Sequence, residues 1–150
     1  MNRVWKPNVT VAAVVEHEGR FLLVEEETED GLRFNQPAGH LDEGESLVEA
    51  CAREALEETA WGFTPTALVG IYQWPRPQGD ITYLRFAFAG ELGSHEEGRP
   101  LDAGILRAVW MTPDEICACS DRHRSPLVWK CVSDYIAGRR YPLELLRHYD

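Results

Sequence analysis

The segment Gly39-His-Leu-Asp-Glu-Gly-Glu45-Ser-Leu-Val-Glu-Ala-Cys-Ala-Arg53-Glu54-Ala-Leu-Glu57-Glu58-Thr59 contains the strongest signal in this sequence of 150 residues. Ser46 and Glu49 have the Ser-x-x-Glu spacing of a capping box, in which each side chain accepts from the other residue's backbone N–H. The residues from 50 to 59 include no Gly or Pro, and most are good helix formers. The segment therefore predicts a helix that begins near Ser46.

Three glutamates of this predicted helix, Glu54, Glu57 and Glu58, stand at positions i, i+3 and i+4. They fall on an arc of roughly 100° beside the apolar face, which comprises Leu47, Val48, Cys51, Ala52, Ala55 and Leu56. Like charges at this spacing destabilise a helix, and the helix dipole favours acids only in the first turn. The arrangement is either a solvated acidic face or a set of oxygen ligands for a hard divalent cation such as Mg²⁺.

The residues around these acids favour the cation. The order Gly39, Glu45, Arg53-Glu54, Glu57-Glu58 resembles the signature of the Nudix hydrolases, a loop-helix-loop motif. One departure is that Ala60-Trp61 stands where the motif has Gly and an aliphatic residue, which leaves open how the chain turns out of the helix. The segments 8–12, 35–41, 83–88, 124–128 and 140–144 resemble small bacterial phosphatases of this family.

The resemblance implies a role for each motif residue. The metal ligands would be Glu54, Glu57, Glu58 and the carbonyl of Gly39, with Mg²⁺ as the cofactor and Mn²⁺ as an alternative. Glu45 and Arg53 would hold the loop against the helix and orient the ligands, although the same pair read without the motif is a surface ion pair. The predicted catalytic residues are thus Glu54, Glu57, Glu58, Arg53 and Glu45.

The general base and the substrate contacts are open at this point. The base is Glu54 or an acid of the long polar segment 93–104, namely Glu96, Glu97 or Asp102. Candidate substrate-binding residues are His40, Trp74, Arg85 and Arg124, the two arginines as phosphate clamps or as surface ion pairs. Other aromatic residues that either stack on a base or fill the core are Phe34, Tyr72, Tyr83 and Trp129.

The composition argues against some classes of binding partner. The chain has 15 Lys and Arg against 25 Asp and Glu, a formal net charge of -10, which argues against binding to duplex nucleic acid. The sequence shows neither a signal-peptide core nor an apolar run of membrane-spanning length, so we expect a soluble, cytoplasmic protein without a membrane partner. The four cysteines lack zinc-site spacing and predict free thiols. We expect a monomer, with a homodimer as the alternative.

The other elements are predicted from hydrophobic patterns and turn residues. Strands are expected at 9–15 and 20–26, paired as a hairpin, and at 67–74, 82–92 and 106–111. An exposed turn is expected at 27–32, a short helix after Thr112 and a final helix over 126–137, ended by Gly138. These elements predict one domain over residues 1–150, an α/β/α sandwich with a mixed sheet, which is also the fold that the Nudix resemblance implies.

The resulting hypothesis is metal-dependent hydrolysis of phosphoanhydride bonds in nucleoside di- and triphosphates and related organic pyrophosphates, including thiamine-precursor diphosphates. One alternative is a non-catalytic, nucleotide-sensing protein of the same fold. Another is a Nudix enzyme that acts on ADP-ribose or another nucleoside diphosphate derivative. With stacking as the main contact to the base, we expect weak discrimination between bases.

Overall fold

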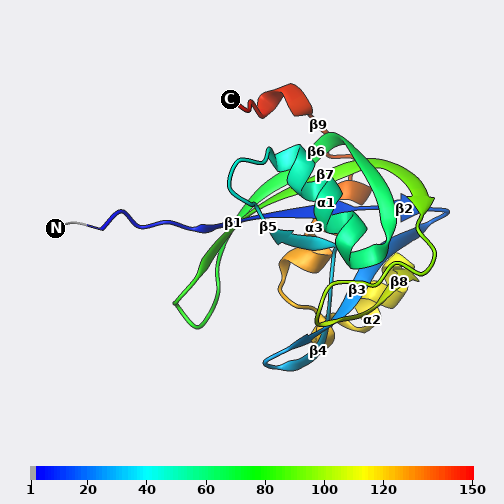
Figure 1. The fold of residues 1–150 in the computed structure, drawn as a ribbon. Coiled ribbons are helices and arrows are strands. Elements are labelled where there is room, and N and C mark those ends of the chain that lie inside the picture. Colours follow the sequence, from blue (N-terminus) through cyan, green and yellow to red (C-terminus); the bar gives the residue numbers. More distant parts are fainter. Residues whose placement is uncertain (1–2) are drawn as a thin grey trace.

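Strand β1 (Asn8–Val14) lies at the centre of the fold in a computed structural model that describes residues 3–150 (Figure 1). It pairs antiparallel with β5 (Ala38–His40) and parallel with β7 (Thr82–His95), so the sheet is mixed. Both faces of β1 are buried. Val11 and Ala13 lie in the cluster that includes residues of α1 (Leu47–Thr59), whereas Ala12 and Val14 lie in the cluster with α3 (Leu127–Ile136). The predicted α/β/α sandwich is therefore confirmed.

The strands form two sheets. The first has the order β5-β1-β7-β6-β9, where β6 is Trp61–Pro75 and β9 is Tyr141–Pro142. In the second sheet β3 (Arg20–Thr28) pairs antiparallel with β2 (Glu16–His17), β4 (Gly31–Asn35) and β8 (Ile105–Met111). The remaining elements are α2 (Pro113–Ala118) and the 3-10 helices η1 (Ser120–Arg122) and η2 (Leu143–Leu145).

Two predicted connections are wrong. Residues 9–15 and 20–26 do not pair along their length, because β1 uses both of its edges for β5 and β7. In the described chain only Val15, whose carbonyl accepts from Leu22 N–H, and the short β2 turn back on β3. Residues 27–32 are not a simple turn either: β3 and β4 continue into this segment and leave a tight connection at Glu29 and Asp30. The hydroxyl of Thr28 accepts from Asp30 N–H and donates to the Gly31 carbonyl, which closes that connection.

Capping residues mark the starts of α1 and α2 and the end of α3, as predicted. Ser46 and Glu49 form the complete capping box of α1, and Thr112 caps α2 in the same way with Pro113 at its first position. Gly138, with φ of 86°, follows the end of α3. The four cysteines are free, as predicted, although Cys117 is exposed. In the described part of the chain, none of the helices combines the length and the apolar character that crossing a membrane requires.

Candidate active site

The backbone of β5 lies directly against the acidic side of α1. A side chain on Gly39 would collide with the carboxylate of Glu54, and the N–H of Ala38 donates to Oε1 of Glu58 at 2.9 Å. Glu54 and Glu58 are consequently buried, with 9% and 8% of their surface exposed. The alternative of a solvated acidic face is therefore wrong for these two acids, because β5 covers them. Glu57 keeps an intermediate exposure.

Burial changes the ionisation of these carboxyls. Burial raises the pKa of Glu54, although the Arg53 guanidinium opposes the change. It also raises the pKa of Glu58 to about 8, against the stabilising hydrogen bond from Ala38 N–H. Because burial disfavours the charged form of each carboxyl, a cation that binds these acids would relieve an electrostatic cost already present in the folded protein.

Arg53 connects the loop before α1 to the acids on it. Its guanidinium forms a bidentate ion pair with Glu45, in which Nε donates to Oε2 at 2.9 Å and Nη2 donates to Oε1 at 2.7 Å. Nη1 donates to Glu54 at 2.8 Å and Glu57 at 3.2 Å, and Nη2 also donates to the His40 carbonyl at 3.0 Å. Hydrogen bonds from Arg53 lower the pKa of Glu45. The geometry agrees with an orienting role for Arg53 and Glu45.

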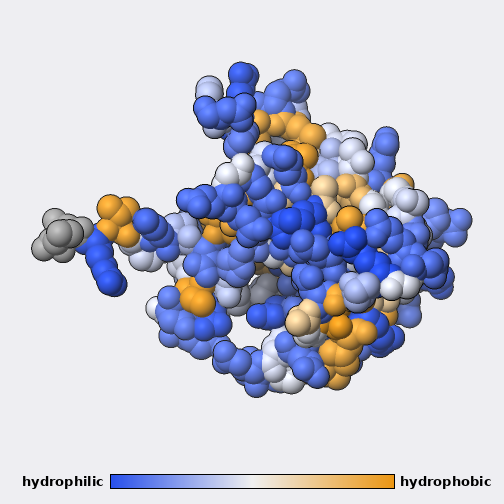
Figure 2. Space-filling view, viewed as in Figure 1, coloured by the Kyte–Doolittle hydropathy of each residue, from blue (hydrophilic) through white to orange (hydrophobic). Residues whose placement is uncertain are grey.

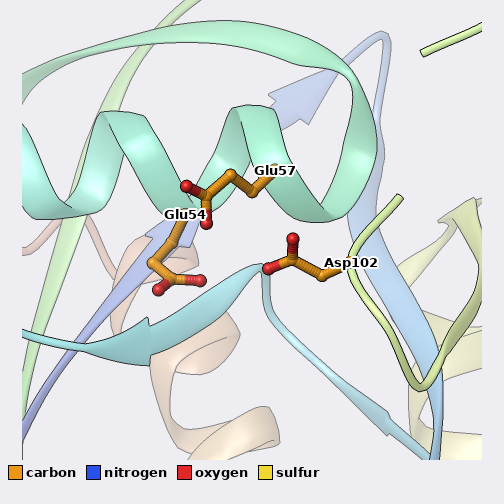
Figure 3. A group of neighbouring side chains, drawn as sticks. All are labelled: Glu54, Glu57 and Asp102. Atoms are coloured by element: carbon orange, nitrogen blue, oxygen red, sulfur yellow. The ribbon is translucent and has the colours of Figure 1, made fainter. Parts of the chain in front are cut away.

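A loop acid completes the cluster. Carboxylate oxygens of Glu54, Glu57 and Asp102 lie within 4.8 Å of one another, and Figure 3 shows the three side chains pointing toward a common space. The N–H of Asp102 donates to the Glu57 carbonyl at 3.0 Å, which fixes the loop against α1. The sequence indicated Asp102 only as one of several possible bases, since nothing local to its loop reveals this contact. Oxygen donors alone are the set that Mg²⁺ or Mn²⁺ prefers, so the residues fit such a cation.

The other acids lie differently. Glu58 is not in the group of three; its Oε1 is oriented toward β5 by Ala38. Glu96 pairs with Arg99 at 2.9 Å and Glu97 contacts His95 at 2.7 Å, both in exposed positions away from the cavity lining. Of the loop acids considered as the base, the structure brings only Asp102 to the cluster.

A cavity of about 920 Å³ opens beside these acids, with Gly39, Glu54 and Glu58 in its wall. It extends between the hairpin that joins β3 to β4 and the hairpin that joins β6 to β7, where Figure 2 shows the surface hollowed. All four predicted substrate-binding residues line it: His40, Trp74, Arg85 and Arg124. Three of the four predicted metal ligands, Gly39, Glu54 and Glu58, thus line the same space as the predicted substrate contacts, whereas Glu57 is not part of its wall.

The four lining residues differ in their surroundings. His40 is exposed, and Arg124 donates to Glu26 at 2.7 Å. The Trp74 ring stacks on Tyr83, with centroids 6.1 Å apart and planes 15° from parallel. Arg85 is 6% exposed, and no carboxylate lies within 4.0 Å of it in residues 3–150. The interpretation of Arg85 as a surface ion pair is wrong.

The remaining aromatic candidates divide between core and cavity. Phe34 is 4% exposed within the core, and Tyr72 donates to Asp134 of α3 at 2.8 Å. Tyr83 and Trp129 line the cavity. Asn35 also lines it, and the sequence offered no signal for this residue beyond its place before Gln36-Pro37.

Comparison with known proteins agrees with this site. The model of the NUDIX domain matches residues 5–129. The chain is 43% identical over 147 residues to Phosphatase NudJ of Escherichia coli K12, covering 98% of this chain and 95% of that protein, and equally to Phosphatase NudJ of Shigella flexneri. It is 52% identical to the structure of a NUDIX hydrolase from Nitrosomonas europaea, with a TM-score of 0.93 over 96% of this chain and 98% of the other.

A more distant structure shares the fold alone: MutT NUDIX hydrolase from Burkholderia pseudomallei is 15% identical with a TM-score of 0.73, over 87% of this chain and 98% of that chain. The motif from Gly39 to Glu58 lies inside the matched range, and its residues Gly39, Glu54 and Glu58 line the cavity. On these grounds the chain belongs to the Nudix domain family.

Proposed function

We propose that this protein hydrolyses phosphoanhydride bonds of nucleoside di- and triphosphates and related organic pyrophosphates with the help of a divalent cation. The observation that carries the proposal is the group of oxygens from Glu54, Glu57 and Asp102, because Glu54 also lines a cavity that contains Arg85 and Trp74. Acids at one end suit a cation that bridges to phosphate, and the rest of the cavity has room for the organic part of the substrate.

The cation would be held by Glu54, Glu57 and Asp102, with Glu58 and the Gly39 carbonyl as further oxygen donors beside Glu54. When bound, Mg²⁺ or Mn²⁺ screens the charge of the phosphate oxygens and makes an attacking water more acidic. Arg53 keeps Glu54 and Glu57 in place through hydrogen bonds, and Glu45 keeps Arg53 in place. A shift of these side chains would misplace the ligands, so we assign Arg53 and Glu45 positioning roles.

Glu54 and Asp102 remain the candidate general bases. Both belong to the oxygen cluster, and the burial that raises the pKa of Glu54 moves that carboxyl toward the range useful for accepting a proton near neutral pH. The similarity to Phosphatase NudJ supports a reaction that releases phosphate. Thiamine-precursor diphosphates stay in the proposed substrate class as an expectation from the sequence.

The test compares Glu57→Gln with Glu91→Gln, which removes one carboxylate from an exposed position of β7 instead. Phosphate release from a panel of diphosphates is measured with Mg²⁺. We expect Glu57→Gln to lower turnover by about a hundredfold or more with an unchanged fold by circular dichroism, and Glu91→Gln to have no effect. Nucleotide binding without phosphate release by the unaltered protein would instead indicate a nucleotide sensor.

A further inference from the structure

Arg85 is a buried cation, and no carboxylate of residues 3–150 forms an ion pair with it. Its Nη1 donates to Oε1 of Gln36 and its Nη2 to Oδ1 of Asn35, each at 2.9 Å, and Nη1 also lies 3.8 Å from Sγ of Cys131. All three partners are neutral groups. An arginine keeps its charge at any relevant pH, and a desolvated charge without a counter-charge is costly. Such a residue on the wall of a cavity favours a ligand that supplies hydrogen-bond acceptors.

The neighbours of Arg85 leave mainly donors for that ligand. Asn35 and Gln36 turn their amide oxygens toward the guanidinium, and Nε2 of Gln36 donates to the Val128 carbonyl at 2.7 Å. The Nδ2 amide group of Asn35 and the rest of the guanidinium are therefore the groups available on this side of the cavity. A surface of donors selects acceptor atoms, such as carbonyl oxygens and ring nitrogens.

Aromatic side chains lie beside these donors. Tyr83 precedes Arg85 by two positions on β7, so both side chains emerge on the same face of the sheet. Trp74 stacks on Tyr83, and Trp129 of α3 lines the same cavity. Aromatic side chains can stack on the faces of a heteroaromatic ring, and the N–H donors next to them can bind the acceptor atoms at its edge.

The distance between Arg85 and β5, the strand that lies against the acidic side of α1, suits the same ligand. Thr10 of β1 is aligned with His40 on one side and with Arg85 on the other. Since neighbouring strands are about 4.8 Å apart, the backbones of His40 and Arg85 are separated by roughly 10 Å. That span leaves room for a diphosphate near Gly39 and for its organic substituent near Arg85.

We propose that Arg85 is a specificity-determining residue, which donates to acceptor atoms on the heteroaromatic ring of the substrate. The inference deepens the proposed function and rests on it. It adds to the expectation of weak discrimination between bases: a site with fixed donors rejects an analogue that lacks the matching acceptors more strongly than stacking alone does.

The test uses two substrates of the same shape, thymidine diphosphate and the diphosphate of its difluorotoluene isostere, which lacks the carbonyl and ring N–H groups. We expect the unaltered protein to prefer thymidine diphosphate by roughly 10- to 100-fold in kcat/KM. Arg85→Met should bring the ratio close to one, and Arg85→Lys should keep only part of the preference. Arg147→Gln removes a positive charge from an exposed position near the C-terminus and should leave the ratio unchanged.

Two outcomes overturn the proposal. If Arg85→Met lowers kcat/KM equally for both substrates, Arg85 contacts the phosphates instead of the ring. If the unaltered protein shows no preference between the two substrates, ring recognition by Arg85 is excluded. Quenching of tryptophan fluorescence by thymidine monophosphate and by its isostere measures the same preference without turnover. If no diphosphate of the panel is hydrolysed, the proposed function fails, while this binding ratio still tests Arg85. If Arg85→Met does not fold, the ratio in Arg85→Lys decides.

Discussion

Gly39 shows how one missing side chain shapes the site. Its backbone lies so close to α1 that a Cβ would collide with the carboxylate carbon and both carboxylate oxygens of Glu54. The only ways to relieve that collision are to move a carboxylate of the acidic cluster or to move β5 away from the helix. A glycine here is therefore a requirement of close packing rather than of backbone conformation.

We predict that Gly39→Ala lowers metal-dependent turnover by about a hundredfold and the free energy of unfolding by about 1–3 kcal/mol, because the added methyl overpacks the contact with Glu54. Phosphate release and urea unfolding measure the two effects. Gly62→Ala is the control, since a Cβ there would lie at an ordinary 3.5 Å from its nearest neighbour, the Ser94 carbonyl. Full activity of Gly39→Ala would show that the position of Glu54 does not matter.

At the scale of the element, α1 ends in an unusual way. Ala60, which stands where the family motif has Gly, adopts the left-handed conformation with φ of 64°, and its N–H donates to the Leu56 carbonyl at 2.9 Å. The departure from the motif therefore leaves the helix terminus intact. Its cost is the strain of a Cβ in this conformation, about 1 kcal/mol relative to Gly.

We predict opposite consequences for two alanine-to-glycine changes in this element. Ala60→Gly should leave the free energy of unfolding unchanged or raise it by up to about 1 kcal/mol, since relief of strain offsets the lost buried methyl. Ala55→Gly, equally buried but inside the helix, should lower it by about 1 kcal/mol or more. Chemical unfolding measures both. Equal losses of unfolding free energy in Ala60→Gly and Ala55→Gly would contradict backbone strain at the C-terminus of α1.

Glu25 joins three elements, β3, β8 and η1. On β3 it accepts from Arg107 of β8 at 2.8 Å and from Arg122 of η1, and the hydrogen bonds from these arginines hold the pKa of Glu25 below its usual value. The side chain is 8% exposed. Because the folded-state pKa is depressed, the stabilisation is present above the unfolded-state pKa and is lost as the pH falls through the folded-state pKa.

We therefore predict that Glu25→Gln lowers the free energy of unfolding by about 1–2 kcal/mol at pH 7, after allowance for the partial exposure of both arginines. The difference in the free energy of unfolding between Glu25→Gln and the unaltered protein should become smaller as the pH falls below about 4.5. Thermal melts across this pH range measure it, with the exposed Glu27→Gln on the same strand as the control. A difference that does not change with pH would exclude ionisation of Glu25 as its cause.

At the scale of the whole molecule, the proposed metal site would link the stability of the fold to metal binding. Glu54 and Glu57 come from α1 and Asp102 from a loop that follows β7, so the cluster exists only in the folded chain. A ligand that binds only the folded state stabilises it in proportion to the logarithm of its concentration once the site is saturated. Metal ions should therefore stabilise the fold as well as support catalysis.

We predict that the melting temperature rises with Mg²⁺ concentration and that Glu57→Gln weakens this dependence strongly. Scanning calorimetry at constant ionic strength, with NaCl replacing MgCl₂ as the control, separates binding from charge screening. A melting temperature that is the same at all Mg²⁺ concentrations would contradict a preformed site and would indicate that metal arrives with the substrate.

The sequence by itself determined the features that depend on neighbouring residues. The capping box of Ser46 and Glu49 predicted the start of α1, Gly138 predicted the end of α3, and the spacing from Gly39 to Glu58 predicted the family and the acids beside the cavity. Each rests on contacts within a few residues or on positions along one helix. Such contacts form wherever those residues fold locally, so their pattern is readable in the chain.

Only the tertiary structure decided the features that join distant segments. It paired β1 with β5 and β7 instead of β3, buried Glu54 and Glu58 under β5, and brought Asp102 to the acids of α1. It also enclosed Arg85 between neutral partners. Pairing partners and burial depend on which surfaces meet after the chain has folded, and no local pattern encodes that choice.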